Sequence, residues 1–154
     1  MIHAGNAITV QMLQDGIAEF RFDLLGESVN KFNKATIDDF QAAIAAVQSH
    51  PEIQGLVVTS AKSTFIVGAD ITEFGANFAQ GEAVIQEWLV SIHQIFNSFE
   101  DLNIPKVVAI NGMALVAVLK CAWCVTIVSW RSQRKSVYLK SSSVFSQVLV
   151  AQSV

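Results

Sequence analysis

The order of the apolar patterns predicts an α/β fold with a mostly parallel sheet. The 154 residues are enough for one domain with its own core. Two alternating segments come first, and each of two helical patterns then leads into a short apolar run. Strands joined by a crossover helix pair in parallel, almost always with a right-handed connection. We therefore expect a sheet covered by helices.

The first two segments predict a β-hairpin. Residues 7–13 and 17–24 alternate apolar and polar side chains on either side of Asp15-Gly16. This dipeptide is typical of a tight turn between paired strands. The polar residues that follow the hairpin predict a loop.

A first helix is predicted to begin at Thr36. Asp39 lies three residues later, which is similar to the paired polar positions of a capping box. Apolar residues then recur at helical spacing as far as Pro51, which ends the stretch. This apolar face consists of Ile37, Phe40, Ile44 and Val47.

Two short apolar runs, 55–60 and 106–110, predict buried parallel strands. A loop and a second, longer helix over roughly 82–100 separate them, and Pro105 marks the end of that helix. Its apolar stripe consists of Ile85, Trp88, Leu89, Ile92, Ile95, Phe96 and Phe99.

Two loops at the ends of these strands are candidates for a site. Residues 65–71, FIVGADI, follow the first strand, and residues 110–115, INGMAL, end the second. Ligands of open α/β sheets bind at the carboxyl ends of strands, where Gly68 allows a close backbone approach. Two N–H groups from the loops could form an oxyanion hole. In the alternative interpretation, Gly68 makes a turn and Asp70 caps a helix, which is the commoner role for such an aspartate.

The composition changes abruptly after residue 115. Residues 1–115 contain five Lys and Arg against thirteen Asp and Glu, a net charge of −8. Residues 116–154 contain five Lys and Arg and no acidic residue, a net charge of +5, and no glycine occurs after Gly112. A chain that folds as one domain does not usually change in this way at one point.

These stretches together resemble the crotonase (enoyl-CoA hydratase/isomerase) superfamily, most closely the hydratase–isomerase part of multifunctional fatty-acid β-oxidation proteins. The resemblance rests on GIAEFRFDLLGESVNKFN, FIVGADITEF and IFNSFEDLNIPKVVAINGMAL and on their spacing, and it covers residues 1–115. It implies an incomplete crotonase-like fold, with residues 1–115 as the N-terminal part of the domain.

The resemblance implies hydration of a trans-2-enoyl-CoA, or isomerisation of its double bond. Two backbone N–H groups would hold the thioester oxygen and two glutamates would act as general acid and base. By position, the oxyanion donors are Ile66 and Ala117. The acyl-CoA site implied by the resemblance consists of Val29, Phe65, Ile66, Gly68, Ala69, Asp70 and Ile71.

After residue 115 the resemblance stops. The family continues with three glycines and a glutamate, but this chain has Val116, Ala117, Val118 and then Lys120. The loss of one base explains this. The codons of Val116, Ala117, Val118 and Lys120 begin GT, GC, GT and AA, and a G placed before these pairs gives codons for three glycines and a glutamate. The same shift places the family's second glutamate at Lys140. We therefore predict that 116–154 is an out-of-frame tail, non-native in sequence, and that the chain is inactive.

A non-catalytic alternative uses the tail as a membrane tether or a partner-binding segment. Residues 110–130 are long and apolar enough to span a bilayer, but Lys120 near their middle costs about 2.5–3.5 kcal/mol. A membrane role is therefore not favoured. Cys121 and Cys124 have C-x-x-C spacing without a redox or zinc context, so we interpret them as incidental. His93 is expected to be structural or exposed.

The expected partners follow from the resemblance. They are an acyl-CoA thioester, further copies in a trimer, or a multienzyme complex with a thiolase subunit. We expect no metal and no cofactor, since coenzyme A is part of the substrate. The acidic main body argues against nucleic acid. The N-terminus lacks the pattern of a secretory signal, which predicts a cytoplasmic location.

Overall fold

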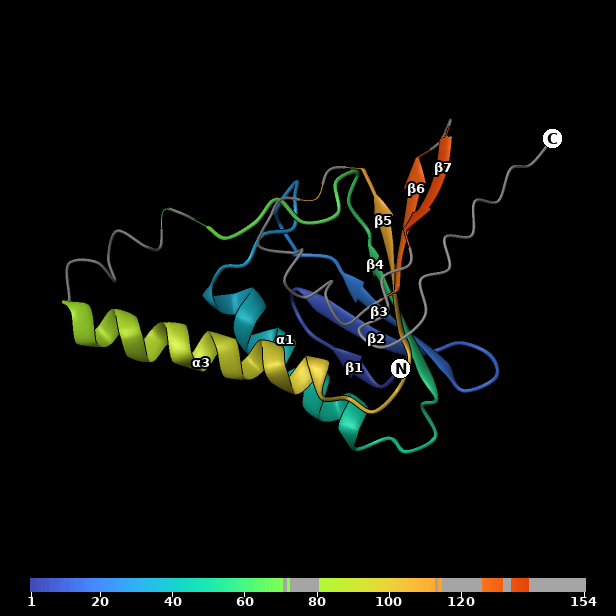
Figure 1. Ribbon diagram of the computed structural model, residues 1–154, viewed down its shortest axis with the longest axis horizontal. Coiled ribbons are helices and arrows are strands. Elements are labelled where there is room, and N and C mark those ends of the chain that lie inside the picture. Colours follow the sequence, from blue (N-terminus) through green and yellow to red (C-terminus); the bar gives the residue numbers. More distant parts are fainter. Residues whose placement is uncertain (71, 73–80, 113, 115–125, 132–133, 139–154) are drawn as a thin grey trace.

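Figure 1 shows the computed structural model, in which two helices lie on one face of a single mixed sheet. The strands follow one another in the sheet in the order of the chain, from β1 to β7. The structure describes residues 1–70, 72, 81–112 and 114, and the backbone of 126–131 and 134–138.

The predicted hairpin and the parallel sheet are confirmed. β2 (Ile8–Met12) and β3 (Ile17–Phe22) pair antiparallel, and Asp15 and Gly16 in the turn between them have positive φ. β3 pairs in parallel with β4 (Gly55–Ser60), and β4 with β5 (Lys106–Asn111). The sequence did not predict β1 (His3–Ala4), which pairs antiparallel with β2.

The first helix, α1, spans Lys34–Gln48, and its predicted start at Thr36 was wrong. The cap is Asn33, whose side chain accepts a 2.9 Å hydrogen bond from the Thr36 N–H. Asp39 is not part of a capping box. It accepts hydrogen bonds from the N–H groups of Ala7 and Ile8 and contacts His3 at 2.6 Å, so it attaches α1 to the N-terminal strands.

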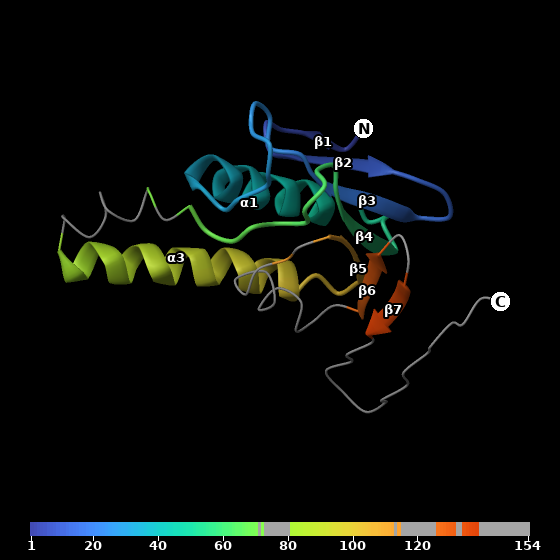
Figure 2. The same cartoon turned by 90° about the horizontal axis from the view of Figure 1, so that it is seen from above.

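The second predicted helix, α3, spans Glu82–Glu100, and α3 lies beside α1 on the same face of the sheet (Figure 2). The core between helices and sheet is rich in phenylalanine. Phe20 of β3 is fully buried and packs edge-on against Phe40 of α1 and Phe99 of α3. Close packing of three elements on one ring determines how the helices sit on the sheet.

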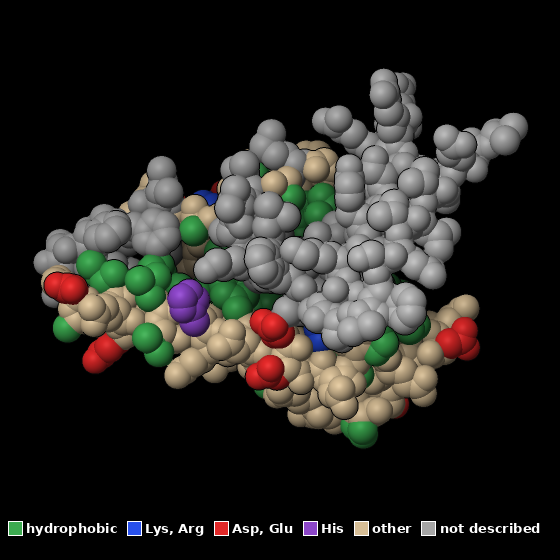
Figure 3. Space-filling model, viewed as in Figure 1, with side chains coloured by type: hydrophobic (Ala, Val, Ile, Leu, Met, Phe, Trp, Pro, Cys, Tyr) green, Lys and Arg blue, Asp and Glu red, His purple; other side chains and the backbone are tan. Residues whose placement is uncertain are grey.

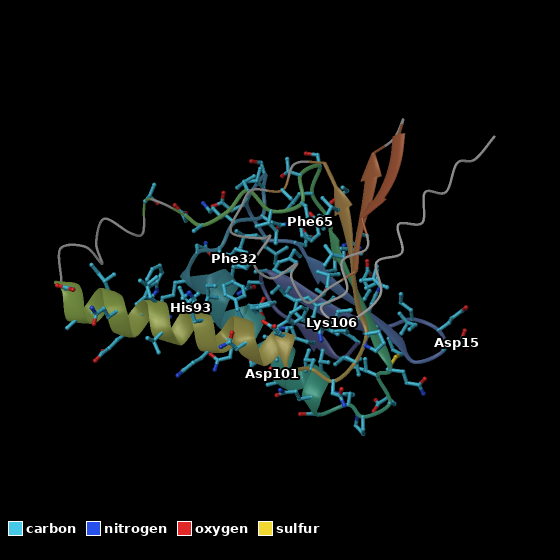
Figure 4. The ribbon with its side chains drawn as sticks, in the orientation of Figure 1. Asp15, Phe32, Phe65, His93, Asp101 and Lys106 are labelled. Atoms are coloured by element: carbon cyan, nitrogen blue, oxygen red, sulfur yellow. The ribbon has the colours of Figure 1, made fainter. Side chains whose placement is uncertain are left out.

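The N-terminal half of α3 is packed less than its apolar stripe predicts. Phe99 is buried, whereas Leu89 is 43% exposed and the neighbouring Val90 is 54% exposed. Apolar side chains are visible along this part of α3 in Figure 3. His93 is exposed, as one of its two predicted roles requires, and it lies on α3 in Figure 4.

Lys106, at the start of β5, is a buried charge that the sequence analysis did not single out. Its side chain is directed at the end of α3, where Nζ donates to the carbonyl oxygens of Glu100, Leu102 and Ile104 at 2.6–3.2 Å. The last carbonyls of a helix lack partners within the helix, and a cation also suits their negative dipole end. Lys106 therefore connects α3 to β5 (Figure 4).

Two strands lie within the segment predicted as a tail. β6 (Thr126–Arg131) pairs in parallel with β5, and β7 (Arg134–Tyr138) pairs antiparallel with β6. Both ends of the stretch 110–130 are thus strands of the sheet, so the stretch is not one membrane-spanning helix. Of the helices in the described residues, none has the length and apolarity needed to cross a membrane.

Candidate functional site

The candidate site is built on a short backbone seam between two loops. In the seam, segment 30–32, just before α1, runs parallel to segment 67–70, which follows β4. Val67 N–H donates to Asn30 O, Phe32 N–H to Gly68 O, and Asp70 N–H to Phe32 O, all at 2.8–2.9 Å. The loop 65–71, which was predicted from the sequence to bind a ligand, therefore lies beside the segment that directly follows Val29.

The side chain of Asn30 holds this seam to the sheet. It is 1% exposed, and its oxygen accepts from the Leu24 N–H at 2.9 Å. Its NH₂ group donates to Ser60 Oγ at 2.9 Å and to the carbonyl oxygens of Phe22 and Phe65 at 3.2 and 3.3 Å. Asn30 was not predicted from the sequence, because a single asparagine in a polar loop gives no sign that it is buried.

The two predicted strand-end loops meet at the carboxyl ends of β4 and β5. Ile66 forms a parallel bridge with Ala114, just beyond β5. Asn111 Nδ2 donates to Lys62 O at 2.6 Å and to Ser60 O at 3.3 Å. The expectation that loops after successive parallel strands converge is confirmed for these residues.

Ala69 is the exposed residue of segment 65–70 in the first loop. Ala69 is exposed, and the seam uses the groups of Gly68 and Asp70 on either side of it. In such a parallel pair, the N–H of the residue between these groups is directed away from the partner segment. Gly68 has a φ of +105°, which favours glycine and turns the chain at this point.

The side chains of Phe65 and Ile66 are 1% and 2% exposed and belong to the core. The N–H of Ile66 as an oxyanion donor stays a prediction, as do the substrate contacts of both residues. Val29 is half-buried, beside the seam. Ile71, Ala117, Lys120, Lys140 and both cysteines lie outside the described residues.

Asp70 is held by three hydrogen-bond donors. Its Oδ1 accepts from the Thr72 hydroxyl at 2.6 Å and from the Thr72 N–H at 3.0 Å, and its Oδ2 lies 3.1 Å from Lys31 Nζ. The Thr72 hydroxyl, followed by Lys31, lowers the pKa of Asp70 from 3.8 to about 2. Asp70 is thus a fixed anion at neutral pH and is unsuited to proton transfer there.

Lys31 also contacts Glu27, at 3.1 Å. The carboxylates of Asp70 and Glu27 raise the pKa of Lys31, which is therefore a cation at neutral pH. In the part of the chain that the structure describes, no three His, Cys, Asp or Glu side chains are grouped as metal ligands.

This fold and this pair of loops define an α/β protein with a candidate ligand site at the carboxyl ends of its parallel strands. The sequence matches the family described as enoyl-CoA hydratase/isomerase over residues 13–133. The chain belongs to the enoyl-CoA hydratase/isomerase family.

Relatives with similar sequences carry the name fatty acid oxidation complex subunit alpha. The protein of that name from Acinetobacter baylyi is 82% identical over 115 residues, and that from Pseudomonas syringae is 54% identical over the same length. In both cases the match covers 75% of this chain and 16% of the relative. The chain therefore spans about a sixth of the length of these proteins.

Solved structures share the fold at low sequence identity. AtuE of Pseudomonas aeruginosa has a TM-score of 0.70 at 17% identity, covering 80% of this chain and 47% of AtuE. An enoyl-CoA hydratase from Shewanella pealeana has a TM-score of 0.67 at 16% identity, covering 83% of this chain and 47% of that chain. The crotonase-like α/β fold predicted from the sequence is confirmed.

Gly112 should be needed for the contact between the two loops. Its φ is +86°, and a Cβ there would overlap the carbonyl oxygen of Ser63. Gly26 has a similar φ of +78° with open space around it, so Gly26→Ala is the matched control. We expect Gly112→Ala to lower the free energy of unfolding by about 1–3 kcal/mol more than Gly26→Ala, measured by urea unfolding. Equal losses would contradict the close approach of Ser63.

Asp70 should make the free energy of unfolding depend on pH in the acidic range. A carboxylate with a lowered pKa in the folded state stabilises above its unfolded value, and the contribution is lost as pH falls from about 4 to about 2. Between these pH values, the urea midpoint of the wild type should therefore fall more steeply than that of Asp70→Asn. Thr72→Val, which removes one donor, should give an intermediate slope. Parallel curves for all three proteins would refute this assignment.

Proposed function

We propose that residues 1–115 form the N-terminal part of a hydratase–isomerase domain that binds acyl-CoA thioesters in fatty-acid β-oxidation. The reaction of such a domain is the hydration of trans-2-enoyl-CoA to 3-hydroxyacyl-CoA. The observation that carries this proposal is the seam between 30–32 and 67–70, which does not use the N–H of the exposed residue Ala69 at the carboxyl ends of β4 and β5.

The chemistry proposed for this chain is the binding of the thioester oxygen. We assign this donation to the N–H of Ala69 in place of that of Ile66, which the resemblance implied, because the seam does not use the Ala69 N–H and holds the backbone on both sides of it. A preorganised donor stabilises negative charge as it develops on the oxygen. Val29, beside the seam, would contact the coenzyme A portion. No resident cofactor is needed, because coenzyme A arrives with the substrate.

The catalytic step needs groups that the proposed tail does not supply. At the positions of the two glutamates this sequence has Lys120 and Lys140, and Ala117 replaces the second oxyanion glycine. An ammonium group cannot act as the general base that activates water at neutral pH. The frame shift at residue 116 is supported by the 115-residue length over which the relatives match, whereas the match to the family itself continues to residue 133.

The assembly and location of the protein are also proposals. The names of the relatives refer to a complex, which supports a multienzyme assembly of the intact protein, with a thiolase subunit or as a trimer of hydratase domains. A cytoplasmic location fits such an enzyme.

Binding should depend on the thioester oxygen. We expect butyryl-CoA to bind this chain about fivefold more tightly than S-butyl-CoA, because a hydrogen bond to the missing oxygen contributes about 1 kcal/mol. Titration calorimetry with both ligands measures the difference. Equal affinities would contradict the proposed hydrogen bond from the Ala69 N–H to the thioester oxygen. No binding of either ligand would refute the proposed function.

The chain should not hydrate crotonyl-CoA at a significant rate. Loss of a general acid or base costs about 10²–10⁴-fold in rate, and two are replaced here. The loss of absorbance of the conjugated thioester measures hydration. The control is the same gene with one base inserted at the junction of codons 115 and 116, which should gain turnover. Comparable rates for both proteins would contradict the out-of-frame interpretation.

A further inference from the structure

The residue after Ala69 carries a full negative charge next to the proposed oxyanion donor. Asp70 is ionised at neutral pH, and its side chain is 14% exposed, so water screens it incompletely. A thioester oxygen that gains negative charge at the Ala69 N–H would be repelled by this carboxylate. A neutral thioester would be affected much less.

Lys31 is placed to compensate this charge. In segment 29–32, Asn30 and Phe32 are buried, whereas Val29 and Lys31 are half-buried. The seam fixes the backbone on both sides of Lys31, and its Nζ lies 3.1 Å from Asp70 Oδ2. The ammonium group of Lys31 thus belongs to the segment before α1 and neutralises the carboxylate of Asp70, in the loop after β4.

In the described part of the chain, three other candidates for this role do not fit it. Thr72 bonds to Oδ1 but is uncharged. Glu27 has an acidic side chain, which supplies no positive charge, and at 43% exposed it is well screened. Lys62 already pairs with Asp23, at 2.8 Å.

We propose that Lys31 is a positioning residue that neutralises Asp70, so that the thioester site tolerates an acyl-CoA whose oxygen bears negative charge. This inference rests on the proposed function, because it assumes that the thioester lies at Ala69. It assigns to Lys31 an effect on which acyl-CoA species binds, in addition to any effect on folding.

The test compares one ligand that forms an enolate with one that does not. Acetoacetyl-CoA, a 3-ketothioester, loses a proton at mildly alkaline pH and its enolate absorbs in the near ultraviolet, whereas butyryl-CoA stays neutral. Calorimetry gives both dissociation constants, and the absorbance change gives the bound enolate. We expect Lys31→Gln to weaken acetoacetyl-CoA about fivefold or more and butyryl-CoA less than about twofold.

Two further variants separate this effect from simpler ones. Lys31→Arg keeps the positive charge and should retain binding and the enolate signal. Lys62→Gln removes a paired lysine of similar exposure, 18% against 23%, and should leave the ratio of the two affinities unchanged. Urea unfolding of each variant shows whether the fold is kept.

The outcomes distinguish the two proposals. Equal weakening of both ligands would mean that Lys31 only orders the loop, and unchanged affinities would mean that it has no part in binding. Either result overturns the proposal for Lys31 and leaves the proposed function standing. Failure of the wild-type chain to bind either ligand overturns both.

Discussion

The buried amide of Asn30 holds together the parts from which the site is built. It contacts the end of β3, the end of β4 and the loop after β4, and its own backbone carbonyl begins the seam. Each buried polar group left without a partner costs about 1–3 kcal/mol. One side chain with several such bonds therefore fixes where the loop 65–70 leaves the sheet. The direction of the Ala69 N–H depends on that position.

The negative charge of Asp70 in the loop 65–70 is less unfavourable for binding a thioester oxygen than the sequence suggests. From the sequence alone, Asp70 is either part of the acyl-CoA site or a helix cap. The structure bonds it to Thr72 and Lys31, so it is a held anion with a neutralising partner. The cap-like role that is common for aspartate explains the contact of Asp70 with Thr72. The proposed role of Lys31 is to neutralise the negative charge that Asp70 keeps in this position.

The two halves of α3 differ in how completely they are packed. The phenylalanine cluster buries the C-terminal end of α3, whereas Leu89 and Val90 are largely exposed. The solved structures align with about half of their own length, so they contain as much chain again as the part that matches. β6 and β7 need only extended backbone and suitable side chains to join the sheet. Their pairing therefore does not distinguish an in-frame segment 116–154 from an out-of-frame one.

The sequence by itself determined the elements whose cause is local. Alternation with Asp15-Gly16 predicted the hairpin, and helical spacing of apolar residues predicted α1 and α3, because periodicity reflects which side faces the core. The strand-end loops and the family were also readable from it. The helix start at Asn33, the use of Asp39 as a clamp for the N-terminal strands, and the buried roles of Asn30 and Lys106 were not. The cap at Asn33 and the contacts of Lys106 have partners nearby in the sequence, namely Thr36 and residues 100–104. Asp39 and Asn30 depend on partners that are distant in sequence or on the other side of a turn. Only the folded chain brings such donors and acceptors within hydrogen-bonding distance, and no local pattern records that they will meet.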